Sequence, residues 1–97
     1  TWGLVGPATA GGWDAAAYTV MSYNIADDYW EITTDLNADE FKFTTNGSWD
    51  INLGGNSVDD LTEGGPNLRI NEAGTYTIKL YPSRTQSNKM YATIEKK

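Results

Sequence analysis

One lysine and one tryptophan, seven residues apart, are the residues whose types and spacing most suggest a binding site. Lys42 is the only basic residue among the first 67, in a region rich in carboxylates, and Trp49 follows it. Phe41 and Phe43 flank the lysine, so a strand would place both rings on one face and Lys42 outward on the other. A solitary outward-facing cation close to an indole predicts a small polar-ligand site rather than a solvated face.

The side chains that usually perform acid–base, nucleophilic or transition-metal chemistry are missing. The chain has no histidine and no cysteine, which removes the common general base near neutral pH and the thiolate ligand. The serines lack a histidine partner, and no pair of carboxylates is singled out by an apolar environment for glycoside hydrolysis. We therefore expect no enzyme activity and no cofactor.

Two acidic pairs are the possible metal ligands. Asp27–Asp28 and Asp59–Asp60 offer the hard oxygens that Ca²⁺ prefers, but neither stretch has the alternating ligand spacing of a calcium loop. We interpret both as solvated acidic turns and predict no metal site.

Composition limits the classes of partner. A net charge of −6 and a pI near 4.3 argue against nucleic acid and anionic membranes, which attract basic proteins. No apolar run has the length of a membrane span. The 97 residues make one domain. Because the chain begins without methionine, we expect a fragment of a larger multi-domain protein or a mature form.

The hydrophobic pattern predicts an all-β fold. Short runs that alternate apolar and polar residues are separated by Gly, Asn, Asp and Pro. Strands are expected at 2–6, 18–23, 29–36, 40–45, 49–53, 68–70, 75–81 and 89–95. Seven or eight short strands in a domain of this size predict an immunoglobulin-like antiparallel β-sandwich.

Connections between these strands carry their own signals. A tight turn at 37–39 should return 40–45 as the partner of 29–36. Asn46–Gly47 is the dipeptide favoured in type I′ hairpin turns. The stretch 54–66, with two Gly-Gly pairs, is the least regular part, and 82–88 is expected to be a polar loop. The one helical stretch, 14–17, is too short to count.

Most of the aromatic residues are expected in the core or in contact with one another. Trp2 and Trp30 alternate in phase with aliphatic residues, which places them on core faces, and Tyr76 does the same. Tyr81 and Tyr91 lie on the polar faces of the last two strands, where they could be cross-strand neighbours.

Two tryptophans remain ambiguous. Trp13 follows a Gly-Gly pair and belongs to no alternating run, so it either caps one end of the sandwich or lies exposed for a ligand. Trp49 is in phase with Ile51 and Leu53, which favours the core, yet a bulge directly after the turn could re-aim it. An exposed ring suits a sugar, because the apolar C–H face of a pyranose packs on an aromatic face and a neighbouring lysine or asparagine can donate to the hydroxyls.

The order of these elements resembles the starch-binding immunoglobulin-like modules of SusE/SusF-type outer-membrane proteins of gut bacteria. The resemblance covers most of the chain. The same order of elements is also similar to glycogen-binding modules, which have a loop tryptophan, an aromatic-Lys-Phe strand and a second tryptophan seven residues after the lysine. The matching segments are Trp2-Gly3-Leu4-Val5-Gly6, Ala8-Thr9-Ala10-Gly11-Gly12-Trp13-Asp14, Met21, Trp30-Glu31-Ile32 with Leu36, Glu40-Phe41-Lys42-Phe43, Trp49-Asp50-Ile51-Asn52-Leu53-Gly54-Gly55 and Ala73-Gly74-Thr75-Tyr76-Thr77-Ile78.

This resemblance implies a carbohydrate-binding module without catalytic activity. It implies that Trp13 and Trp49 stack on the sugar and that Lys42 donates to its hydroxyls. Asn67 is the best candidate for a further polar contact, with Asn52 or Asn56 as alternatives. It implies starch or a maltooligosaccharide as ligand, a location at the cell surface on the outer membrane through an anchor outside this chain, and other components of a glycan-uptake complex as partners. The alternatives are an immunoglobulin-like spacer without ligand, and a module for another glycan.

Overall fold

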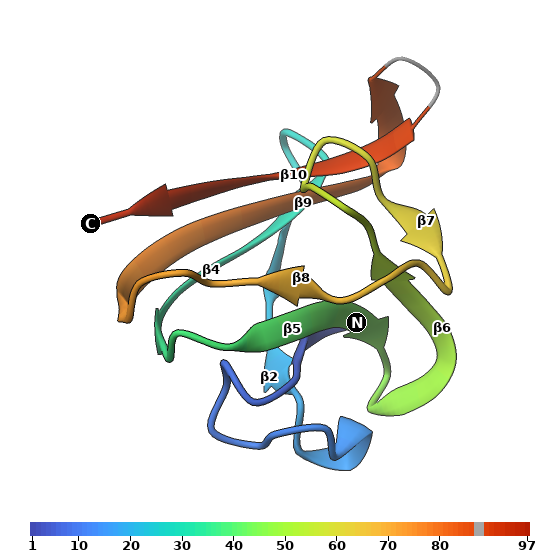
Figure 1. Ribbon diagram of the computed structural model, residues 1–97. Helices are drawn as coiled ribbons and strands as arrows, with labels where there is room; N and C mark the ends of the chain where they lie inside the picture. Colours follow the sequence, from blue (N-terminus) through green and yellow to red (C-terminus); the bar gives the residue numbers. More distant parts are fainter. Residues whose placement is uncertain (87–88) are drawn as a thin grey trace.

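The computed structural model describes the backbone of residues 1–86 and 89–97, and it shows two antiparallel sheets packed face to face (Figure 1). The all-β sandwich predicted from the sequence is confirmed. The elements are β1 (Trp2–Val5), a 3₁₀ turn η1 (Ala15–Ala17), β2 (Thr19–Val20), β3 (Ser22–Asn24), β4 (Tyr29–Leu36), β5 (Glu40–Thr45), β6 (Ser48–Gly54), β7 (Thr62–Glu63), β8 (Leu68–Arg69), β9 (Gly74–Gln86) and β10 (Lys89–Lys96).

The two sheets divide the strands in an order that the sequence did not reveal. One sheet has the order β2-β1-β5-β6-β7, with β8 added on β5, and the other has the order β10-β9-β4-β3. The predicted pairing of 29–36 with 40–45 is therefore wrong, because β4 pairs with β9 and β3 while β5 pairs with β1, β6 and β8.

The turn between β4 and β5 is a corner between the sheets. The backbone N–H of Asn37 donates to the carbonyl of Ala8 at 2.9 Å, and the N–H of Ile70 donates to the carbonyl of Asp39 at 2.8 Å. These bonds tie the turn to segments beside β1 and β8, so the chain leaves β4 and enters the opposite layer. A tight turn thus connects two sheets here instead of closing a hairpin.

The core lies between the sheets and follows the predicted alternation. Phe41 and Phe43 are 1% and 0% exposed, and their rings meet edge to face at 5.7 Å between centroids. Trp2 and Trp30 are half-buried and pack against the core, as predicted. Burial of rings and aliphatic side chains of this size contributes roughly 1.5–3 kcal/mol each, and this core holds both layers in place.

Two further expectations about strands are corrected by the structure. The predicted strand 18–23 is divided at the buried Met21, because β2 pairs with β1 in one sheet whereas β3 pairs with β4 in the other. The predicted loop 82–88 is strand as far as Gln86, β10 begins at Lys89, and residues 87–88 lie outside the described part of the chain. Gln86 pairs with Lys89 and Tyr81 pairs with Tyr91, with a shift in register between the two pairs, so the polar composition did not end the pairing of these strands.

Candidate functional site

Trp13 is held on a short, tightly bonded connection between β1 and η1. The carbonyl of Gly12 accepts a 2.7 Å hydrogen bond from the N–H of Gly6, and Gly12 adopts φ +61°, a conformation that glycine takes without a steric cost. After the tryptophan, the carboxylate of Asp14 caps η1 by accepting from the N–H of Ala16 at 3.1 Å. Both neighbours of Trp13 are thus held in place, and its side chain is 39% exposed.

The hairpin turn between β5 and β6 lies against η1. Asn46 and Gly47 have φ of 55° and 64°, and Thr45 pairs with Ser48, so the predicted type I′ turn is confirmed. A Cβ on Gly47 would lie only 3.5 Å from the carbonyl oxygen of Ala15. This contact brings the start of β6 beside the loop that carries Trp13.

A bulge at the start of β6 decides the orientation of Trp49. Thr45 of β5 pairs with Ser48, but the next residue back along β5, Thr44, pairs with Asn52. Residues 49–51 therefore lack a partner on β5, and all three are exposed. The bulge overrides the alternation that would have placed Trp49 in the core with Leu53.

Thr44 holds this bulge closed from inside. Its side chain is fully buried, and its hydroxyl lies within hydrogen-bond reach of the carbonyls of Ser48 and, at 3.1 Å, Ile51. The Asn52 amide adds a 3.2 Å bond to the carbonyl of Trp49. Carbonyls that the bulge removes from the ladder thereby regain donors, which stabilises the conformation that presents Trp49.

The two ambiguous tryptophans meet at the surface. The centroids of Trp13 and Trp49 are 6.0 Å apart, and their planes make an angle of 40°. Trp49 is 41% exposed, close to the value for Trp13. Two neighbouring rings that are fixed by packing and yet accessible form a hydrophobic platform, hereafter the indole platform.

Lys42 was expected to project into solvent, but it is buried. Its side chain is 8% exposed, and its Nζ donates a 2.6 Å hydrogen bond to the carbonyl of Gly65. Gly54 makes this possible, because a Cβ there would lie 2.9 Å from Cε of Lys42 and 2.8 Å from the Gly65 oxygen. The irregular 54–66 segment thus folds over the lysine, and burial lowers the pKa of its ammonium group below the usual 10.5.

The three asparagines considered for a polar contact lie in different surroundings. Asn52 belongs to β6, where it bonds the backbone of Trp49. Asn56 and Asn67 line a hollow beside β8, whose lining contains neither tryptophan nor Lys42. The structure therefore places Asn52 beside the indole platform, and it places Asn67 in the hollow beside β8, apart from the tryptophans.

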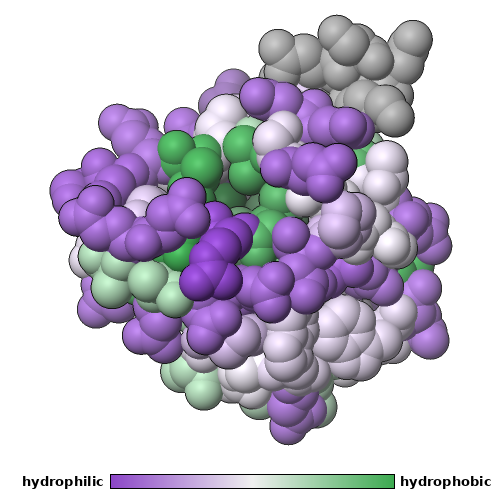
Figure 2. All heavy atoms as spheres, in the orientation of Figure 1, coloured by the Kyte–Doolittle hydropathy of each residue, from purple (hydrophilic) through white to green (hydrophobic). Residues whose placement is uncertain are grey.

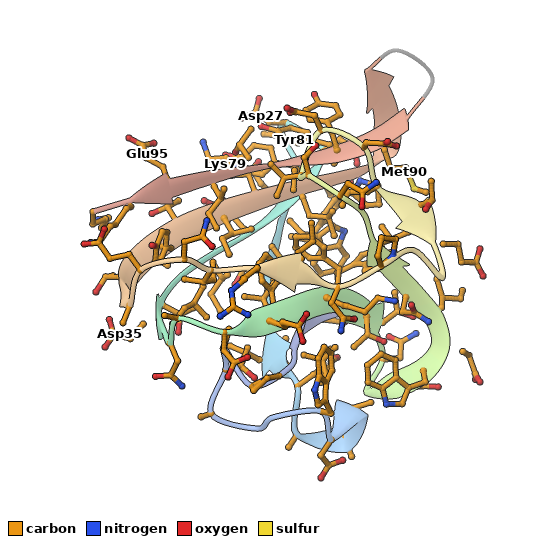
Figure 3. All side chains as sticks on the ribbon, in the orientation of Figure 1. Asp27, Asp35, Lys79, Tyr81, Met90 and Glu95 are labelled. Atoms are coloured by element: carbon orange, nitrogen blue, oxygen red, sulfur yellow. The ribbon has the colours of Figure 1, made fainter. Side chains whose placement is uncertain are left out.

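A second aromatic group, made of half-buried tyrosines, lies on the outer face of the four-stranded sheet. Tyr81 and Tyr91 are cross-strand partners, as expected, and they stack with centroids 4.6 Å apart at 14°. Tyr29 lies 5.3 Å from Tyr81 on the other side, with Nζ of Lys79 5.0 Å from its centroid. Figure 3 shows Lys79 and Tyr81 on the side of this sheet away from β8 and β5. These rings cover one another's faces, so they offer a sugar less than the indole platform does.

Other kinds of site find no support in the part of the chain that the structure describes. No three acidic side chains gather there as a group that could hold a metal ion. None of its helices is long and apolar enough to cross a membrane.

Comparisons with protein-family models, with curated proteins and with solved structures found no match to this chain.

Proposed function

We propose that this domain binds an α-glucan such as starch or a maltooligosaccharide on the indole platform, without catalysing a reaction. The observation that carries the proposal is the exposed pair Trp13 and Trp49, set at 40° with centroids 6.0 Å apart. Aromatic faces pack well on the C–H faces of pyranose rings. Two faces set at an angle match the natural bend of an α-1,4 chain, whereas a flat row of rings suits a flat β-1,4 chain.

Lys42 enters this proposal in two ways. Its side chain is 8% exposed and its bond to Gly65 uses one of its three N–H donors, so contact with a sugar hydroxyl requires the covering 54–66 segment to move. The same bond anchors the segment that covers β6. The proposed affinity is modest, because a single shallow platform buries little surface and ordering the sugar opposes binding.

The resemblance of the sequence supports a wider proposal about where the module acts. We place it at the cell surface, as part of a larger outer-membrane protein that works with other components of a glycan-uptake complex. Several such modules in one protein would raise the overall affinity through effective concentration. Protease treatment of intact cells that produce the parent protein tests this: a surface location predicts cleavage without lysis.

The central test is a titration with maltoheptaose, followed by tryptophan fluorescence and calorimetry. We expect a saturable fluorescence change and a dissociation constant between roughly 10 µM and 1 mM. Trp13→Ala should abolish both signals and leave the protein folded. Tyr23→Ala is the matched control, because Tyr23 is an exposed ring (45%) on β3, outside the indole platform.

Two outcomes would contradict the proposal. Absence of heat and fluorescence change with maltoheptaose would leave the domain as a spacer. A response to cellohexaose but not to maltoheptaose would identify the platform as a site for a different glycan.

A further inference from the structure

The two sheets separate along one side of the sandwich and leave a hollow between β8 and β10. The 57–62 segment covers the first part of β10, through hydrogen bonds from Ala92 N–H to Val58 at 2.8 Å and from Leu61 N–H to Met90 at 2.9 Å. Figure 3 shows Met90 pointing from β10 toward this segment. Beyond Ala92, β10 and β8 are not paired, since β8 is bonded to β5.

The hollow combines an apolar floor with a polar rim. It encloses about 230 Å³, and an adjoining hollow of about 400 Å³ shares Arg69, Asn71 and Ile94 with it. Figure 2 shows apolar surface sunk between polar rims in this part of the molecule. The floor comes from Phe41, Val58, Leu68 and Ile94.

Five polar side chains surround this floor: Asn56, Ser57, Asn67, Arg69 and Asn71. Across the residues that the structure describes, none of these side chains bonds another residue, and all five residues are exposed. Arg69 in particular has no ion pair in that part of the chain, although Glu40 lies opposite it in the strand register. In contrast, Lys96 of the adjoining hollow is neutralised by an ion pair with Glu72.

These groups define the chemistry of a ligand. An unpaired guanidinium matches a carboxylate, which it can bind through two parallel hydrogen bonds. Three amides provide both donors and acceptors for neighbouring hydroxyls, and the apolar floor suits a face of C–H groups. The volume is below that of sites for drug-sized ligands and corresponds to a single small ring.

We propose that this hollow is a second binding site, for a hexuronate unit, the carboxylated form of a hexose. Arg69 holds the carboxylate, the amides of Asn56, Asn67 and Asn71 bond the hydroxyls, and Ile94 and Val58 contact the ring. This site lies apart from the indole platform and goes beyond the proposed α-glucan function. It also gives Asn67 a role that does not depend on the tryptophans.

The test is an NMR titration of the ¹⁵N-labelled domain with glucuronate, glucose and acetate. We expect glucuronate to shift the side-chain amide signals of Asn56, Asn67 and Asn71 saturably, with a dissociation constant on the order of 1 mM. Glucose lacks the carboxylate and acetate lacks the ring, so each should bind at least about tenfold more weakly. The indole N–H signals of Trp13 and Trp49 should respond to maltoheptaose instead, which keeps the two proposals separable.

Variants then assign the ligand contact. Arg69→Gln should weaken glucuronate binding at least about tenfold, whereas Lys97→Gln, which also removes one exposed positive charge, should leave it unchanged. Glu40→Gln should strengthen binding, because it removes a negative charge that lies opposite Arg69 in the strand register and repels the carboxylate of the ligand. No saturable shift up to roughly 50 mM glucuronate, equal shifts with acetate or glucose, or full affinity in Arg69→Gln would each overturn the proposal.

Discussion

The indole of Trp13 lies with its centroid 6.0 Å from that of Trp49, although one ring comes from the loop after β1 and the other from the start of β6. Neither element places its tryptophan alone. The loop is held by the cap of η1, and the strand is held by the bulge over Thr44. The contact between η1 and the hairpin turn then brings the two rings together.

This pair should show a measurable coupling in stability. Because both rings are about 40% exposed, Trp13→Ala and Trp49→Ala should each lower the free energy of unfolding by no more than about 2 kcal/mol. The double variant should lose less than the sum, by about 0.5–1.5 kcal/mol, the value of a tilted aromatic pair. Urea unfolding of all four proteins measures this cycle, and strictly additive losses would mean that the rings do not pack on each other.

Thr44→Val should destabilise the bulge that presents Trp49. Valine has the same shape but cannot serve the carbonyls of Ser48 and Ile51, so the free energy of unfolding should fall by about 1–3 kcal/mol. The bulge should loosen, and maltoheptaose should bind more weakly although no ring has been removed. Thr33→Val is the control, because Thr33 is an exposed threonine of the four-stranded sheet whose hydroxyl bonds that of Thr77 on the neighbouring strand. Equal effects of both substitutions would contradict a specific role for Thr44.

Lys42 should make the stability depend on pH in a defined direction. Burial lowers its pKa in the folded protein, so between this value and the unfolded value the unfolded chain binds more protons. Its contribution to the free energy of unfolding should therefore rise with pH through that window. The free energy of unfolding of the wild type, relative to that of Lys42→Met, should therefore increase as the pH approaches 10.5.

The control for this measurement is Lys97→Met, which removes an exposed lysine at the end of the chain. If the free energy of unfolding of the wild type relative to Lys42→Met stays constant or falls with rising pH, Lys42 is solvated in solution. Maltoheptaose titration of the same variant separates the two proposed roles: a folded Lys42→Met protein with wild-type affinity would restrict Lys42 to the scaffold.

Gly54→Ala should be far more damaging than Gly12→Ala. A Cβ at Gly54 would lie 2.1 Å from the carbonyl oxygen of Pro66, so the backbone of the covering segment must move. We expect a loss of about 3 kcal/mol or more. At Gly12 a Cβ meets nothing within 4 Å, and only its φ of +61° opposes alanine, which costs about 1–2 kcal/mol. Thermal unfolding compares the two, and a tolerated Gly54→Ala would show that the segment is not packed on β6.

Much of the scaffold could be read from local patterns. The bounds of β4 and β5 and the Asn46–Gly47 turn follow from alternation and turn chemistry, which act between near neighbours. The partner of β4 could not be read in this way, because a three-residue turn is compatible with either a hairpin or a corner. Bonds from Asn37 and Asp39 to distant segments decide between them.

The candidate site shows the same division. The residue pattern indicated Lys42 and left Trp13 and Trp49 ambiguous, and the family resemblance then implied that all three contact a sugar. The structure decided between the alternatives for Trp49, because the bulge considered in the sequence analysis does turn it outward, and it showed that Lys42 is covered by a glycine-rich segment. Asn67 was selected from the family resemblance. The hollow that it lines is formed by the separation of the two sheets and could not be read from the sequence.

The β-sandwich and the absence of histidine and cysteine chemistry could be read from the chain, because hydrophobic period, turn residues and composition are local properties. Packing in three dimensions determines which strands share a sheet, that two distant indoles meet, and that Lys42, the one basic residue among the first 67, is buried. These depend on long-range backbone bonds and on close approaches at Gly47 and Gly54. The alternation of apolar and polar residues predicts which residues share a face of a strand, whereas tertiary packing determines what lies opposite that face.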